Sequence, residues 1–199
     1  MSQEIIKLML QGIEETFYMV AVATVIAGII GIPLGVTLVT TSKGHILQNL
    51  FINRILGTIV NIIRSVPFII LMVAIIPLTI VAIPFLSRLV ETSIRDVDYG
   101  LVEAAESMGA TPFQIIRKVL LPEALPTIIN NVTVLIVNLI GASAMAGAIG
   151  GGGLGDIAIR YGYQRFRPDV MLATIIILIV VVNLIQYGGD LASHKKNKK

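Results

Sequence analysis

The stretch EAAESMGATPFQIIRKVLLP, residues 103–122, lies as a polar island between strongly apolar runs. Glycine takes the left-handed backbone conformation at little cost, so Gly109 predicts the end of a helix that begins after a cap at Asp98. Thr111 suits the N-cap of a second helix, because proline follows it and glutamine stands three residues after it. The sequence therefore predicts a helix-turn-helix over residues 98–122.

Three features of this stretch stand at fixed spacing: a Glu-Ala-Ala triplet, a glycine after three further residues, and an apolar residue followed by proline. They are Glu103, Ala104, Ala105, Gly109, Leu121 and Pro122. The pattern resembles the EAA motif in permease subunits of bacterial binding-protein-dependent ABC importers. The resemblance implies that these residues form a cytoplasmic coupling element whose first helix sits in a cleft of an ATPase subunit. Pro122 is expected to end the second helix or to kink it into the next apolar run.

The composition places the chain in a lipid bilayer. Of its 199 residues, 55% are hydrophobic and 14% are charged, whereas soluble domains average about 25% charged residues. There is no cysteine and there are only two histidines, which excludes disulfides and predicts no metal site. The net charge of +3 reflects basic loops and a basic tail rather than a surface for nucleic acid.

The apolar runs predict an all-α, multi-pass transmembrane helix bundle that forms one domain over residues 1–199. Residues 16–40, 124–148 and 168–187 are each long enough to cross, at roughly 20 residues per crossing. Residues 1–11 are expected to form either a short amphipathic helix or a frayed terminus, without a cleaved signal peptide.

Glycines in the first span predict a packing seam. Gly28, Gly31 and Gly35 lie near one helical face. Gly31 and Gly35 form a small-xxx-small pair, which lets another helix backbone approach closely.

Residues 57–95 leave two topologies open. The uncharged run 66–86 is one span if taken alone, or part of two spans that fold back at residues 77–79. Five crossings with the N-terminus outside put 11 basic residues on the cytoplasmic side and 4 outside, whereas four crossings give 9 and 6. The positive-inside rule favours five. Both topologies keep residues 103–122 and the C-terminus in the cytoplasm. The resemblance implies that the chain lies in the inner membrane of a bacterium.

The resemblance also favours five spans, but it indicates a shortened region. Residues 64–68 look like the start of the family's second span, and residues 83–86 look like part of its third. An outer loop and the first turns of a third span would need about 15 to 20 residues more than the chain has near residues 77–79.

The span over residues 124–148 is unusually polar. It carries Asn130, Asn131, Thr133, Asn138 and Ser143. Polar side chains within a span face either the bundle interior or a pathway, so helix packing and a translocation path both remain open. The candidates for lining a path are Asn138, Ser143 and Met145, the last with a soft, polarizable thioether.

A glycine-rich turn over residues 150–155 follows this span. No Gly-Lys-Ser/Thr comes after it, so it is not a phosphate cradle, and its missing side chains allow another backbone to approach. Residues 160–167, RYGYQRFR, predict an interfacial aromatic belt with basic anchors. The resemblance places this region on the face that receives the binding protein. The candidate contacts are Gly151, Gly152, Gly153 and Arg160.

The resemblance implies a membrane-spanning subunit of an ATP-driven importer, and almost the whole chain is similar to methionine-uptake permeases. The implied partners are a second copy of the chain around a central path, two ATPase subunits that bind ATP and Mg, an extracytoplasmic substrate-binding protein and membrane lipid. The chain has no Walker A lysine motif, so it is expected to catalyse no reaction and to hold no cofactor itself.

Other functions compete with this interpretation. An ion-coupled secondary transporter would carry charged pairs near the middle of its spans, and the apolar cores of the predicted spans contain none. An intramembrane enzyme would need a buried Ser/His or paired Asp, but Ser65 and Ser143 have no histidine within reach in the predicted topology. An importer permease for another small amino acid or ligand is the remaining alternative.

Overall fold

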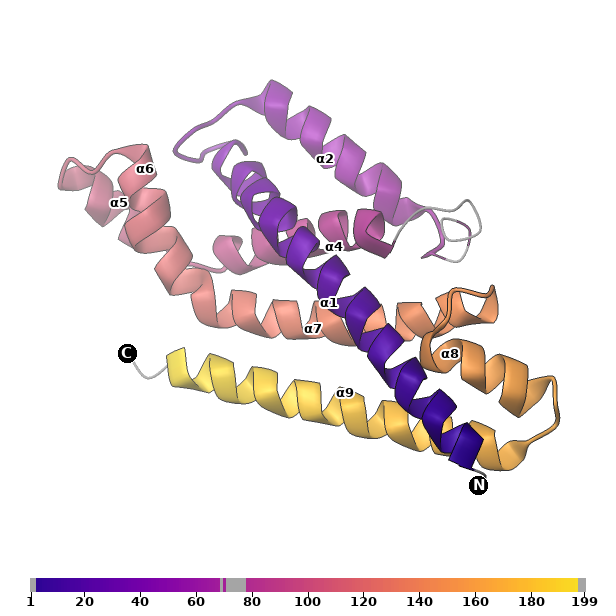
Figure 1. Cartoon of the computed structure of the whole chain (residues 1–199). Helices are drawn as coiled ribbons and strands as arrows, with labels where there is room; N and C mark the ends of the chain where they lie inside the picture. Colours follow the sequence, from indigo (N-terminus) through magenta and orange to yellow (C-terminus); the bar gives the residue numbers. More distant parts are fainter. Residues whose placement is uncertain (1–2, 69, 71–77, 197–199) are drawn as a thin grey trace.

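The structure, a computed structural model, describes residues 3–68, 70 and 78–196. This part of the chain is helical and contains no strand, as the apolar patterning predicts (Figure 1). The elements are α1 (Gln3–Thr40), α2 (Leu50–Ser65), α4 (Leu78–Arg95), α5 (Tyr99–Ser107), α6 (Pro112–Ile115), the π-helical segment η1 (Ile116–Leu120), α7 (Leu121–Ala148), α8 (Gly153–Ile157), the π-helical segment η2 (Ala158–Tyr163) and α9 (Pro168–Lys196).

Three helical stretches are long and apolar enough to cross a membrane: Gln3–Thr40, Pro112–Ala148 and Pro168–His194. They contain the three clear spans that the sequence predicts. The separate amphipathic helix expected over residues 1–11 is wrong, because α1 runs unbroken from Gln3. Gly12 lies within α1 and packs closely against Ile157 of α8.

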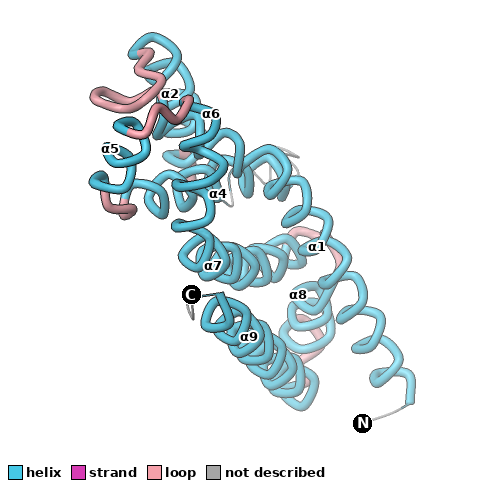
Figure 2. Tube along the Cα trace, turned by 90° about the vertical axis from the view of Figure 1, so that its left-hand side faces the viewer, coloured by secondary structure: helices cyan, strands magenta, loops and turns pink. Residues whose placement is uncertain are grey.

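A seam of small residues joins α1 to α4, as the glycine spacing predicts. A Cβ atom at Gly31 would lie 3.0 Å from the carbonyl oxygen of Ile83, and one at Gly35 would lie 2.6 Å from that of Ser87. Gly28 does not belong to the seam, because a Cβ atom there would meet open space. α9 lies against α7, and α1 lies against α4, α7 and α8 (Figure 2).

At one end of the molecule, which we call the α5 end, residues 41–49 lie beside α5. The hydroxyl of Tyr99 donates a hydrogen bond of 3.1 Å to the carbonyl oxygen of Gly44. The last turns of α9 reach the same end, where the hydroxyl of Ser193 donates to the carbonyl oxygen of Pro126 at 3.2 Å. The α5 end therefore contains residues 41–49, the helix pair and the C-terminal part of α9.

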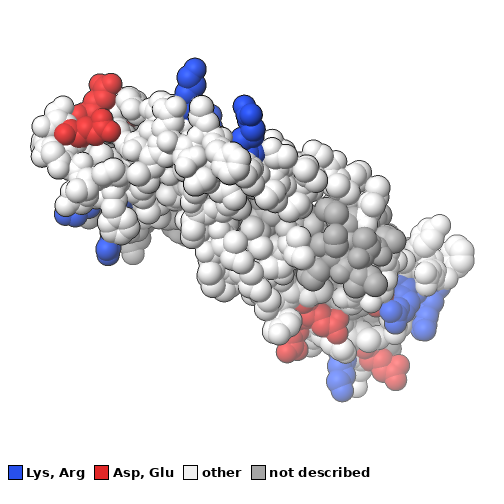
Figure 3. All heavy atoms as spheres, turned by 90° about the horizontal axis from the view of Figure 1, so that it is seen from above, with Lys and Arg blue, Asp and Glu red and all other residues white. Residues whose placement is uncertain are grey.

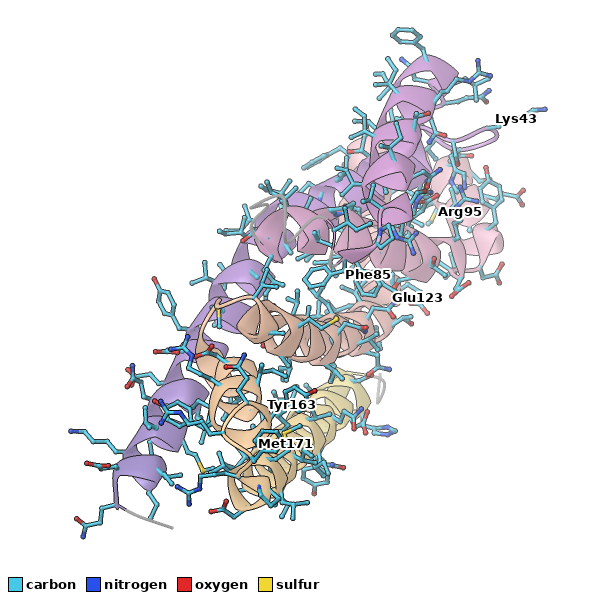
Figure 4. The ribbon with its side chains drawn as sticks, turned by 90° about the vertical axis from the view of Figure 1, so that its right-hand side faces the viewer. Lys43, Phe85, Arg95, Glu123, Tyr163 and Met171 are labelled. Atoms are coloured by element: carbon cyan, nitrogen blue, oxygen red, sulfur yellow. The ribbon has the colours of Figure 1, made fainter. Side chains whose placement is uncertain are left out.

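The opposite end, which we call the α8 end, contains the start of α1. Ile5 and Met9 form a small buried cluster with Ile157 of α8 and Val170 of α9. In Figure 4, Lys43 and Arg95 lie toward the α5 end, and Tyr163 and Met171 lie toward the α8 end. Acidic side chains on the face in Figure 3 lie toward its two ends, whereas two basic side chains project from the upper edge nearer the middle.

The region with two open topologies contains α2 and α4. α2 begins at Leu50, and the side chain of its N-cap residue, Asn49, accepts a hydrogen bond from Ile52 N. Of the predicted fold at residues 77–79, Pro77 lies outside the described residues, and Leu78 and Thr79 form the start of α4.

Candidate functional site

The helix pair at the α5 end forms as the sequence predicts. Oδ1 of Asp98 accepts a hydrogen bond of 2.9 Å from Gly100 N, which caps α5. Gly109 has a φ of 77°, the left-handed conformation that ends the helix. The side chains of Thr111 and Gln114 form a reciprocal capping box at the start of α6. Local sequence signals therefore determine both helix starts and the turn between them.

Pro122 does not end the second helix. The chain continues from α6 through η1 into α7, with Pro122 in the first turn of α7. Proline has no N–H to donate, and its ring clashes with the carbonyl four residues earlier in a regular α-helix. The π-helical turn just before it changes the hydrogen-bond register at that point, which lets the helix pass the proline. The helical stretch Pro112–Ala148 therefore joins α6 directly to a predicted span.

The helix pair has a buried side and an exposed side. Ala105 and Ile115 join the main core. Three large apolar side chains are exposed at the surface, where Leu101 is 42%, Met108 81% and Phe113 68% exposed. Phe113 and Ile115 are two residues apart, which is a turn of about 200° around a helix, so their side chains point apart.

The Glu-Ala-Ala triplet lies across this division, with Glu103 and Ala104 exposed and Ala105 buried. The main-chain carbonyl of Glu103 accepts a hydrogen bond from the hydroxyl of Ser107. Its carboxylate has no hydrogen-bond partner within the described part of the chain. Glu103 and these large apolar side chains are thus all exposed on the helix pair.

The start of α5 is held by the segment that follows α1. Besides the bond from Tyr99 to Gly44, the rings of His45 and Tyr99 meet edge to face, with their centroids 6.1 Å apart. Burial and, to a smaller extent, the nearby Arg95 lower the pKa of His45. The neutral imidazole is therefore favoured beside the tyrosine.

At the α8 end, the glycine-rich turn receives two side chains of α1. Gly153 N donates to the carboxylate of Glu15 at 2.7 Å, and Leu154 N donates to the hydroxyl of Thr16 at 3.0 Å. A Cβ atom at Gly153, whose φ is 76°, would lie 2.7 Å from that hydroxyl oxygen. A Cβ atom at Gly155 would clash with the carbonyl oxygen of Ala144 in α7. The prediction that missing side chains admit another backbone is therefore confirmed for α7, whereas α1 contributes side chains.

The first half of the predicted aromatic belt over residues 160–167 is helical, because the stretch of α8 and η2 extends to Tyr163. Arg160, an expected contact for the binding protein, is exposed and forms a salt bridge of 2.9 Å with Asp156. The guanidinium of Arg165 lies 4.5 Å from the ring centre of Tyr161. Among the candidate glycines, Gly151 is exposed and Gly153 is buried.

One face of α7 is exposed along the whole helix. Its members recur every three or four residues: Glu123, Thr127, Asn130, Val134, Asn138, Gly141, Met145 and Ala148. We call this face the α7 stripe. Asn138 and Met145, two of the path candidates, lie on it and line one cavity of about 210 Å³ together with Phe85 of α4. Phe85 is labelled in Figure 4.

Ser143 and Asn131 lie off this stripe. Ser143 is 2% exposed, and its hydroxyl donates to the carbonyl oxygen of Ile140 in the same helix. Two residues separate it from Met145, which places it about 200° around the helix. The amide of Asn131 donates to the carbonyl oxygen of Leu89 and to the hydroxyl of Ser93. Helix packing therefore accounts for part of the polarity of this span.

A charged group in α4 was missed by the sequence analysis. Glu91 is 5% exposed and forms salt bridges with both Arg88 and Arg95. Arg88 also donates to the side chain of Asn61 in α2 at 2.7 Å. The spacing of three and four residues around Glu91 is the signal that could have revealed it. Both carboxylate oxygens of Glu91 are therefore paired within α4. The bond from Arg88 to Asn61 joins α4 to α2.

Comparison with known proteins defines the family. Residues 31–191 match the model of the binding-protein-dependent transport system inner membrane component. The chain therefore belongs to this family of inner-membrane transport components.

Relatives and solved structures agree with this assignment. The chain is 55% identical to the probable D-methionine transport system permease protein MetI of Vibrio cholerae, over 92% of this chain and 89% of that one. It is 46% identical to the protein of the same name from Pasteurella multocida, over 88% and 89%. A chain in the inward-facing MetNI methionine ABC transporter superposes with a TM-score of 0.95 at 42% identity, over 98% and 99% of the two chains.

The alignments also bear on the shortened region. The Vibrio alignment has 201 positions and covers 92% of this 199-residue chain, or about 183 residues, which leaves about 18 positions without a counterpart here. The Pasteurella alignment has 194 positions and covers 88%, or about 175 residues, which leaves about 19. These numbers agree with the predicted shortfall of 15 to 20 residues. Its location near residues 77–79 stays a prediction.

Proposed function

We propose that this chain is the membrane-spanning subunit of an ATP-driven methionine importer. The observation that carries the proposal is the helix pair itself, on which Glu103, Leu101, Met108 and Phe113 are all exposed, in a member of this transport family. Large apolar side chains outside the spans are expected to be covered by a partner. Methionine as substrate rests on the names of the relatives and of the similar transporter.

The helix pair is the coupling element in this proposal. Its partner is a separate ATPase subunit, which binds ATP and Mg, and the six motif residues contact it or shape the contact. Gly109 turns the chain, Ala105 packs α5 on the core and Glu103 offers an unpaired carboxylate to the partner. Because α6 continues into α7, a pull on the pair would act directly on a membrane span. Closure of the ATPase subunits could then favour one of two packings of the spans.

Five crossings with the N-terminus outside are the proposed topology. The support is that residues 41–49 and α5 share one end, while the start of α1 and α8 share the other. Four crossings would place the start of α1 at the same end as α5. In the proposed orientation, the α5 end is cytoplasmic, and the α8 end, with Gly151 and Arg160, faces the substrate-binding protein.

The α7 stripe is the proposed contact with a second copy around the central path. Most of its members are polar or small, whereas side chains in contact with acyl chains are usually large and apolar. Asn138 and Met145 are the path candidates that it supports. Ser143 is not proposed for this role, since its side chain is buried on the other side of the helix.

Ion-coupled transport has one observation in its favour, the buried Glu91. A carboxylate that carried ions or protons through a cycle would need a free oxygen or a partner that releases it. Both oxygens of Glu91 instead accept from arginines on its own helix. The family match and the exposed helix pair favour the importer subunit.

The test is co-purification with the ATPase subunit from detergent. Glu103→Lys reverses the unpaired charge and should weaken the association constant by about tenfold or more, the value of a hydrogen bond to a charged group. Gly109→Val should also weaken it, because a β-branched residue is strained at a φ of 77°.

Glu14→Lys is the matched control, because this residue is exposed on α1 toward the α8 end. It should co-purify as well as the wild-type protein. Wild-type association that neither Glu103→Lys nor Gly109→Val reduces would contradict the coupling role of the helix pair.

A further inference from the structure

The cap on the start of α8 comes from α1, 138 residues away in the sequence. The N-cap residue of α8, Gly152, has no side chain and therefore cannot cap the helix itself. Glu15 and Thr16, two consecutive residues of α1, each accept one main-chain N–H of the first turn of α8. We call this contact the α8 clamp. It replaces the local cap that most helices have.

The conformation of the glycine-rich turn makes room for the clamp. Gly152 and Gly153 both have positive φ values, and a Cβ atom on either would crowd the clamp oxygens. The second carboxylate oxygen of Glu15 accepts from the amide of Gln11 at 2.9 Å, which orients the side chain. A change in the position of α1 would therefore move the start of α8.

At its other end, α1 is tied to α5 in two ways. The segment just after α1 receives the hydrogen bond from Tyr99, the first residue of α5. The glycine seam packs α1 on α4 without room for a side chain, and only three residues separate the end of α4 from the start of α5. Close-packed contacts of this kind transmit displacement rather than absorb it.

α1 is long enough to join these contacts. Its 38 residues span about 57 Å, compared with about 30 Å for the hydrocarbon core of a bilayer. We propose that α1 acts as a strut that links α5 mechanically to α8, with Glu15 and Thr16 as positioning residues for the start of α8. The inference rests on the proposed function, in which the ATPase subunit binds α5 and the substrate-binding protein meets the α8 end.

The test uses the assembled transporter in proteoliposomes, with methionine uptake and ATP hydrolysis measured together. Glu15→Ala should lower the uptake per ATP hydrolysed by about tenfold, while co-purification with the ATPase subunit is unchanged. Glu15→Gln should restore most of the uptake, because the amide oxygen still accepts from Gly153 N. Glu14→Ala, an exposed neighbour on the same helix, is the control and should behave as wild type.

A double-mutant cycle separates a strut from two independent contacts. Tyr99→Phe removes the hydrogen bond to Gly44 and keeps the ring beside His45. If α1 links the two ends, the double variant Glu15→Ala with Tyr99→Phe should take up no less methionine per ATP hydrolysed than the poorer single variant. Should Glu15→Ala fail to assemble, Thr16→Val, which keeps the side-chain shape, takes its place in the cycle.

Two results would contradict the proposal that α1 acts as a strut. Additive losses in the double variant would mean that the two contacts act separately, and normal coupling in Glu15→Ala would mean that the clamp positions nothing. Both require a wild-type complex that binds the ATPase subunit and takes up methionine. A wild-type complex that does neither would instead overturn the proposed function, and the strut with it.

Discussion

α7 and α9 lie side by side, yet their exposed faces differ in chemistry. The exposed face of α9 is large and apolar along most of its length: Leu172, Ile175, Ile176, Ile179, Val180, Leu184, Tyr187 and Leu191 are each at least 43% exposed. The α7 stripe contains acidic, amide, hydroxyl and small side chains, and only Val134 and Met145 on it are large and apolar. Two neighbouring helices in one membrane therefore face different surroundings.

The difference indicates what covers each helix. Acyl chains solvate large apolar side chains well but leave amides without partners, so the exposed face of α9 suits lipid. Glycine and alanine at an exposed surface allow another helix to approach closely, and the amides of Asn130 and Asn138 suit water or a partner. On this comparison, we propose that α9 faces lipid at the outside of each subunit and that α7 lies between two copies.

An arginine placed on each exposed face in turn should show the largest difference between α7 and α9. Ile176→Arg puts a charge against lipid, which costs about 2.5 to 3.5 kcal/mol at the centre of a span. Asn138→Arg, on the stripe, should cost less because water or polar groups are within reach. The yield of folded protein extracted from membranes in mild detergent measures the difference. Equal yields for the two variants would contradict the comparison.

A bulky side chain at a glycine gives the next largest effect. A Cβ atom at Gly141 of the stripe, or at Gly188 of α9, meets nothing in the same chain within 4 Å. We therefore expect Gly141→Ile to act mainly through a contact with another molecule, where overpacking should weaken self-association by about 1 to 3 kcal/mol. Gly188→Ile should leave it unchanged. Sedimentation of the purified protein in detergent reports the dimer fraction, and a matching loss in both variants would count against the stripe.

The smallest effect should come from the two polar path candidates. Asn138→Ala removes an exposed amide from the stripe and should lower methionine uptake by about three- to tenfold, the value of one neutral hydrogen bond. Ser143→Ala removes a buried hydroxyl that bonds only to its own helix, so uptake should change less than twofold. Initial uptake rates in proteoliposomes measure both. A larger loss for Ser143→Ala would reverse the assignment of the path.

Sequence signals predicted the parts of the fold that depend on neighbouring residues. Asp98, Gly109 and Thr111 act within a few residues of the helix ends that they cap, so the helix pair could be read directly. The Gly31 and Gly35 seam was also predictable, because both glycines fall on one face. The spans in α1, α7 and α9 followed from their apolar lengths.

The remaining features depend on distant residues. The helix over α8 and η2 was missed because its glycine-rich start resembles a loop until Glu15 and Thr16 of α1 cap it. Ser143 could not be assigned to a face without knowing which side of α7 packs on the core. The passage of the helix through Pro122 depends on a π-helical turn, for which the sequence carries no simple signal.

Cysteine cross-linking tests most directly whether the α7 stripe lies between two copies. The sequence contains no cysteine, so each introduced thiol is the only one in its chain. Asn138→Cys, Gly141→Cys and Met145→Cys would be oxidised in membranes beside Leu172→Cys, Ile176→Cys and Ile179→Cys from α9. We expect covalent dimers from at least one stripe position and from none of the α9 positions. Dimers that form only through α9 would contradict the account.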